Sequence, residues 1–319
     1  MITEKQSKAL YAIRAFAILS VILAHMPFGE AHPTAESVRI ALGQVGVAVF
    51  FIVSGFFYKR EQGDSKSFFL SKLKTIVVPW LLISIGTFAF SAFLSRDLGG
   101  FPVSLVKWML GVKTWYWYLP VLLVLYALFG RIYKNGAILT VCVFISVASV
   151  MLSAFGVIKY GEIFDQHFNV LNWVGLFALG CLIKKYSLID RLSGVLPLLI
   201  SLAVLTASVI LSVKFGQDKA YIDYFSIPVE ISGFVLLYNL SFALSEVKPL
   251  CDIGKKSFFI YLIQMQPAGI INTRLPYNVP LFIIRPFAVL AVLYLLSLLL
   301  QLVLKKLKLE KYAFVLALK

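Results

Sequence analysis

The chain has 319 residues, of which 60% are hydrophobic and 14% charged, and its mean hydropathy is +0.90. Soluble domains contain about 25% charged and about 45–50% apolar residues, so this composition excludes a water-soluble globular protein. Collagen-like, disordered and disulfide-stapled chains are excluded as well. The apolar content is close to what about ten spans of about 20 residues need, which predicts a single membrane domain over the whole chain.

The net charge is +15, from 30 Lys and Arg against 15 Asp and Glu. In a membrane protein such an excess is expected in cytoplasmic loops, so it does not indicate a nucleic-acid partner. The cysteines, Cys142, Cys181 and Cys251, stand singly in or beside apolar stretches and fit neither a disulfide framework nor a metal site. Arg14 inside the first apolar stretch, without a small-residue cleavage site, indicates a retained span.

Apolar segments between short polar loops predict a bundle of about ten transmembrane helices, because a lipid-exposed open sheet cannot cross a bilayer. An even number of spans puts both termini on one side. Lys and Arg concentrate in the loops on the side of the N-terminus, which predicts cytoplasmic termini in a multi-pass protein of the cell membrane. The expected spans are 9–28, 38–58, 75–95, 116–133, 136–157, 167–184, 192–214, 225–245, 257–273 and 279–304.

The first span, LYAIRAFAILSVILAHM, contains Arg14 and His25. Ionisable residues inside a span are costly and are functional candidates. Eleven residues of helix turn through about three full turns plus about 20° and rise roughly 16 Å, so both side chains project from nearly the same face. For each residue alone, snorkelling of Arg14 or an interfacial position of His25 is an open alternative. Their shared face favours a polar track inside the bundle.

Three further groups of residues have both a structural and a functional interpretation. Ser54, before Gly55, forms a small-residue notch for close helix packing. Lys72 and Lys74 precede the third span. They suit either phosphate binding or a role as positive loop charges that orient the chain in the membrane. Aromatic residues near span ends favour interface anchoring, although Trp117 and Tyr118 also suit a sugar-stacking platform. The other expected anchors are Tyr11, Trp80, Trp108, Trp115 and Tyr116.

Five motifs occur in order along the chain: IRAFAILSVILAH, VGVAVFFIVSGFF, SKLKTIVVPW, WYWYLP and IGKKSFFIYLIQ. Together they resemble the acyltransferase 3 family of integral membrane acyltransferases. The resemblance implies O-acylation: an acyl group, usually acetyl, moves from cytoplasmic acetyl-CoA to a hydroxyl of a cell-surface or lipid-linked glycan, without a metal. Larger members carry an appended extracytoplasmic domain, which we do not expect here.

The resemblance also implies roles for individual residues. His25 matches the family's catalytic histidine and Arg14 its essential arginine in the first span. Lys72 and Lys74 stand where the family usually has arginines; lysine is a point-charge donor rather than a bidentate fork. Gln264 stands where many members have a histidine, and it forms hydrogen bonds but does not titrate.

A mechanism follows as a hypothesis. His25 takes the proton of the acceptor hydroxyl as general base, because histidine ordinarily titrates near neutral pH. A transient acetyl-His25 is a lower-ranked variant. Glu230 in IPVEISGF, the only acid clearly inside a span, either orients His25 or satisfies Arg285 or a backbone group. Arg14, Lys72 and Lys74 hold the coenzyme phosphates.

Two other functions stay open at this point. A transporter or flippase for a glycan precursor suits a polytopic chain with intramembrane charge, although no pair of Gly/Pro-broken spans occurs in matching halves. A non-catalytic subunit of a polysaccharide synthase would not need Arg14 or His25. The sequence does not specify the glycan, the hydroxyl, the acyl group or the oligomeric state.

Overall fold

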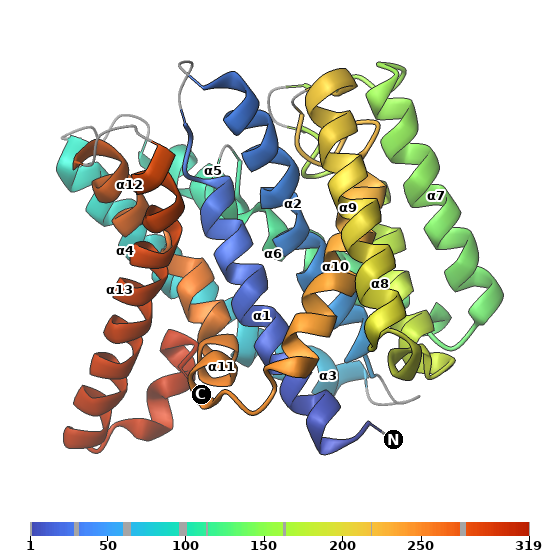
Figure 1. The fold of residues 1–319 in the computed structure, drawn as a ribbon. Helices are drawn as coiled ribbons and strands as arrows, with labels where there is room; N and C mark the ends of the chain where they lie inside the picture. Colours follow the sequence, from blue (N-terminus) through green and yellow to red (C-terminus); the bar gives the residue numbers. More distant parts are fainter. Residues whose placement is uncertain are drawn as a thin grey trace.

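The computed structural model describes residues 2–28, 32–59, 65–95, 101–112, 114–161, 164–217, 219–274 and 279–318. This part of the chain folds into an all-helical bundle of thirteen α-helices (Figure 1), which confirms the predicted fold class. Their bounds are α1 Glu4–Ala24, α2 Pro33–Phe56, α3 Ser65–Lys72, α4 Val78–Ser95, α5 Phe101–Leu110, α6 Tyr118–Ile132, α7 Gly136–Ala154, α8 Val170–Lys185, α9 Val195–Phe215, α10 Ser226–Ala243, α11 Lys248–Ile263, α12 Met265–Arg274 and α13 Val279–Lys306.

Eight helical segments of the described residues are long and apolar enough to cross a membrane. They support a multi-pass integral membrane protein. The two other expected spans, 167–184 and 257–273, correspond to shorter elements: α8 has 16 residues, and the second region divides at Gln264 into α11 and α12. A straight crossing of the hydrocarbon core needs about 20 residues. Hydropathy alone therefore overestimated the length of the first segment and the continuity of the second.

Helix α1 lies at the centre of the bundle. It packs against α2, α10, α11 and α13. The helix begins with a reciprocal capping box, in which the Thr3 hydroxyl accepts the Gln6 N–H and the Gln6 side chain accepts the Thr3 N–H. Buried Ala9, Ala12 and Ala17 keep its surface narrow, which lets neighbouring helices approach closely.

Helix α2 depends on glycine for its contact with α8. A Cβ atom placed on Gly180 of α8 would lie 1.9 Å from the carbonyl oxygen of Ile52. A Cβ on Gly55 of α2 would lie 2.0 Å from the carbonyl oxygen of Phe177. The two backbones therefore touch at complementary notches, which confirms the packing interpretation of the Ser54–Gly55 segment.

The periphery of the bundle is apolar. Helices α9 and α13 are the least buried of the candidate spans, and they expose side chains such as Leu199 and Leu295. In a bilayer these side chains contact acyl chains. Figure 1 places both ends of the chain at the same end of the bundle, as an even number of crossings requires.

We expect Gly180→Val to lower the midpoint of thermal unfolding, at a cost of about 1–3 kcal/mol, because the new side chain collides with backbone that cannot rotate away. Gly86→Val in α4 is the matched control, since a Cβ there meets no atom within 4 Å. Thermal unfolding of the purified protein checks this. Equal midpoints for the two variants would contradict the close α2–α8 packing.

Candidate active site

Arg14 faces an internal cavity of about 200 Å³ between α1, α2, α6 and α11. Its guanidinium carbon lies 5.5 Å from the ring centroid of Tyr11 and 5.4 Å from that of Phe57. No ion pair joins Arg14 to an acid within the described residues. The cavity, named here the Arg14 cavity, therefore presents a cation whose charge is not balanced by a neighbouring carboxylate, which suits it to bind an anion.

His25 caps the C-terminal end of α1 and faces a second cavity, of about 160 Å³. Its backbone is fixed on both sides: the N–H donates to the carbonyl of Ile22 at 3.0 Å, and the carbonyl accepts the Asn272 Nδ2 at 3.2 Å. These bonds hold the imidazole at the wall of this cavity, named here the His25 cavity.

The two cavities are adjacent. Four side chains line both of them: Val21, Val47, Tyr118 and Tyr261. Val21 follows Arg14 by seven residues and precedes His25 by four, which are both close to whole turns of a helix. All three therefore project from one face of α1, as the spacing predicts. Side chains that line both cavities therefore lie between the cation and the imidazole.

Tyr118 and Ser54 belong to this region. Ser54 lines the Arg14 cavity, and its Oγ lies 3.4 Å from the Tyr118 Oη. The Tyr118 ring packs 4.6 Å from the Phe51 ring and 5.8 Å from the Tyr261 ring, measured between centroids. Of these two predicted substrate-binding residues, Tyr118 lies at the boundary between the cavities, and Ser54 lies next to it in the Arg14 cavity.

The segment before α6 lies inside the bundle. Trp115, Tyr116 and Trp117 form a short 3₁₀ turn and are buried, as is Trp80. The expectation that these four residues anchor the membrane interface is wrong, because their side chains are buried among the helices. Hydropathy locates the end of a span but does not show whether the side chains there face lipid or the protein interior. Trp117 lines the His25 cavity, with its ring 5.0 Å from the Trp173 ring.

Lys72 and Lys74 occupy different surroundings. The Lys72 Nζ lies 4.9 Å from the ring centroid of Tyr126, a residue that lines the Arg14 cavity. The exposed Lys74 places its Nζ 4.8 Å from the ring of Phe314, near the C-terminus. Lys72 therefore lies beside the Arg14 cavity, whereas Lys74 lies outside it.

Four lysines border a separate pocket of about 450 Å³, named here the lysine pocket. They are Lys59, Lys134, Lys184 and Lys185. Tyr58 also lines this pocket, and its ring stacks on the Tyr126 ring at 5.8 Å while its hydroxyl donates to the Tyr126 carbonyl at 2.9 Å. The Tyr58–Tyr126 pair therefore stands between the lysine pocket and the Arg14 cavity.

Glu230 and Gln264 are buried but line neither cavity. Within the described residues, no hydrogen bond joins Glu230 to His25, so the structure does not form the predicted pairing. Gln264 lies at the break between α11 and α12, and neither atom of its amide has a hydrogen-bond partner in the described part of the chain.

The sequence interpretation missed His167, which lines the His25 cavity. Its Nδ1 lies 2.9 Å from the Oδ2 of Asp165, and its ring centroid lies 4.8 Å from that of Trp117. Burial raises the pKa of Asp165, but the hydrogen bond and charge of His167 outweigh burial and leave that pKa below its usual range. The two residues are in the loop between α7 and α8, where charged side chains are common and nothing in the sequence marks these two as functional.

The family model of the acyltransferase 3 domain matches residues 8–305. The chain belongs to the acyltransferase 3 family. The match covers nearly the whole bundle and confirms the resemblance carried by the five motifs. Comparisons with curated proteins and with solved structures find no match. The protein is therefore a membrane-bound acyltransferase, with an acyl donor and an acceptor.

Asp165→Asn tests how the His25 cavity is built. A carboxylate whose folded pKa is lowered stabilises the fold above its unfolded pKa, and this contribution is lost as the pH falls through the folded pKa. We expect the variant to lose about 1 kcal/mol at neutral pH and to match the parent protein in acid. Thermal unfolding across a pH series checks this. A difference that does not change with pH would contradict the contact between the Asp165 carboxylate and His167.

Proposed function

We propose that this acyltransferase moves an acyl group, acetyl in the first instance, from cytoplasmic acyl-CoA to a hydroxyl of a cell-surface or lipid-linked glycan. Family membership supplies the reaction class. One observation carries the rest: Arg14, without an acidic partner among the described residues, and His25 face adjoining cavities on one side of α1. This arrangement favours an enzyme over a transporter, because it joins an anion site to a proton acceptor.

The donor binds from the cytoplasmic side, where the termini and the lysine pocket lie in this proposal. Coenzyme A is polyanionic at one end and carries the acyl group on a long arm. Arg14 and Lys72 attract the phosphates, and the lysine pocket adds four cations next to them. Lys74 contributes only to the potential of that surface. The rise from Arg14 to His25, roughly 16 Å, is comparable to an extended pantetheine arm.

The acyl arm then occupies the Arg14 cavity and passes the wall at Tyr118 and Tyr261. Ser54, which lines the Arg14 cavity beside Tyr118, offers a hydroxyl to the amides of the arm. Movement of the side chains of Val21, Val47 and the two tyrosines, which line both cavities, opens the path in this proposal. The thioester carbonyl reaches the His25 cavity in this way.

The chemical step is direct transfer. The acceptor oxygen attacks the thioester carbon, its proton passes to His25, and the new C–O bond replaces the C–S bond. The coenzyme leaves as the thiolate and recovers the proton from the imidazolium. A sugar hydroxyl is a weak nucleophile at neutral pH, so a base in contact with it accelerates attack.

The acceptor occupies the far side of the His25 cavity. Trp117 offers a ring face for a sugar, and Tyr118 offers a hydroxyl. Because Asp165 engages the Nδ1 of His167, the Nε2 is the nitrogen that remains for an acceptor hydroxyl. Glu230 lines neither cavity, so its role as an orienting residue stays a prediction. Gln264 also stays a predicted substrate contact; its buried amide has no hydrogen-bond partner among the described residues, and a ligand would satisfy it.

His25→Asn removes the proton acceptor while keeping a polar side chain of similar size. Acyl transfer, measured as coenzyme A thiol release together with mass spectrometry of surface glycans, should fall about 10²–10⁴-fold. Acetyl-CoA binding and the unfolding midpoint serve as controls and should not change. Undiminished glycan acylation by a well-folded His25→Asn protein would refute the role of His25.

The donor site is tested with a truncated donor. Acetyl-pantetheine lacks the nucleotide, so only acetyl-CoA exploits the cationic groups. The double variant Lys184→Gln, Lys185→Gln should lose about tenfold in kcat/KM for acetyl-CoA and little for acetyl-pantetheine. Lys305→Gln, Lys306→Gln, at the exposed end of α13, is the matched control. Equal losses for both donors, or for both pairs of lysines, would contradict the placement of the nucleotide.

A further inference from the structure

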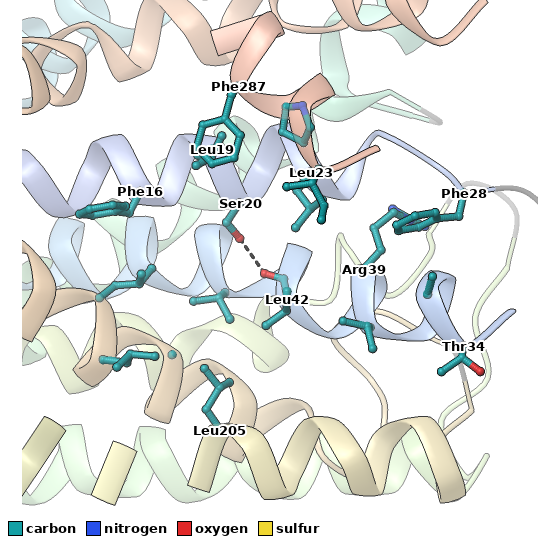
Figure 2. Close-up of a pocket in the computed structure, with 18 of the residues that line it drawn as sticks. Phe16, Leu19, Ser20, Leu23, Phe28, Thr34, Arg39, Leu42, Leu205 and Phe287 are labelled. Carbon is teal, nitrogen blue, oxygen red and sulfur yellow. Dashed lines mark hydrogen bonds between the residues drawn. The ribbon is translucent and has the colours of Figure 1, made fainter. Parts of the chain in front are cut away.

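A groove of about 890 Å³ runs along the opposite face of α1 from Arg14 and His25. Helices α1, α2, α9, α10 and α13 contribute its lining. Figure 2 shows Phe16, Leu19 and Leu23 of α1 following one another along it. Since α9 and α13 are the least buried spans, this groove opens on the lipid-facing flank of the bundle.

The length of the groove is apolar. Leu42, Leu205 and Phe287 face it from α2, α9 and α13 (Figure 2). The one hydroxyl along this stretch of α1, that of Ser20, donates to the Leu42 carbonyl at 2.7 Å, so its hydrogen-bonding capacity is already used within the protein. This stretch therefore accepts a hydrocarbon chain and offers nothing to a polar one.

One end of the groove is polar. Arg39, Phe28 and Thr34 all lie toward that end (Figure 2). Its Nε donates to the Glu36 Oε2 at 2.8 Å, one terminal nitrogen donates to the other Glu36 oxygen, and the second terminal nitrogen donates to the Ala24 carbonyl. Each terminal nitrogen carries a further N–H, so the Glu36–Arg39 pair still offers donors and acceptors to hydroxyl groups.

Arg39 joins this groove to the candidate active site. Its mostly buried side chain lines both the groove and the His25 cavity. A molecule whose chain lies in the groove therefore has its head next to the cavity that contains His25. A head group in this position can react at the His25 cavity, which a phospholipid elsewhere on the surface of the bundle cannot do.

We infer that the groove binds the hydrocarbon chain of a lipid-linked saccharide, which is the acceptor. The saccharide lies at the Glu36–Arg39 pair, whose paired charges and neighbouring Phe28 ring suit hydroxyls and a sugar face. The chain fixes the depth of the sugar and raises its effective concentration at the His25 cavity. The assignment of this lipid as acceptor rests on the proposed function; binding in the groove does not.

A photoreactive benzoylphenylalanine at position 19 identifies the occupant directly. Membranes from the native host are irradiated and the adducts are identified by mass spectrometry. With the probe in place of Leu19, the adduct should contain a saccharide-bearing lipid. The yield of this adduct should be about tenfold or more above that from the same probe in place of Leu295. Leu295 is an exposed α13 residue outside the groove and should capture bulk phospholipid. The same phospholipid adducts at both positions would overturn the inference.

Two variants separate this inference from the proposed reaction. Leu19→Trp, which fills the groove, should raise the KM for the captured glycolipid about tenfold and leave acetyl-CoA binding unchanged, whereas Leu295→Trp should change neither. The His25→Asn protein carrying the probe should form the same adduct, since the groove lies on the other face of α1. An adduct without any acylation would refute the reaction alone; acylation of glycolipid that is indifferent to Leu19→Trp would refute the groove alone.

Discussion

An arginine enclosed in a membrane bundle without a neighbouring carboxylate is the constraint from which the rest of the structure follows. Burying a guanidinium in a low-dielectric interior is costly unless an opposite charge or water accompanies it. Around Arg14 the described neighbours are rings, those of Tyr11 and Phe57, and a cavity. The fold therefore keeps a space open beside this charge. In our proposal an anionic ligand occupies that space, and its binding recovers the cost of the unbalanced charge.

Helix α1 connects this constraint to the chemistry. One of its faces presents Arg14, Val21 and His25 to two successive cavities, and its other face lines the apolar groove. Large side chains of α1, among them Ile13, Ile18 and Ile22, are fully buried against its neighbours, and buried alanines let those neighbours approach closely. The α2–α8 contact depends likewise on glycine. Large and small residues together therefore hold the bundle around the cavities.

The sequence predicted the helices and the shared face of Arg14 and His25 because both depend on local periodicity, which a single helix specifies. It did not predict the His167–Asp165 pair, since a loop between α7 and α8 reaches the His25 cavity only through tertiary packing. The lysine pocket was not predicted for the same reason. Its four lysines come from three separate segments, and each one alone looks like a loop charge that orients the chain in the membrane. The described residues show no hydrogen bond between Glu230 and His25, since similar depth in a membrane does not by itself place two helix faces opposite each other.

The position of the coenzyme sulfur in a structure of the protein with bound coenzyme A tests the central claim most directly. The account predicts phosphates at Arg14 and Lys72, an arm along the Arg14 cavity, and a sulfur at the wall formed by Tyr118 and Tyr261, from which an acyl carbon reaches the His25 cavity. A coenzyme bound outside the bundle, or an arm that stops on the far side of Tyr126, would contradict it.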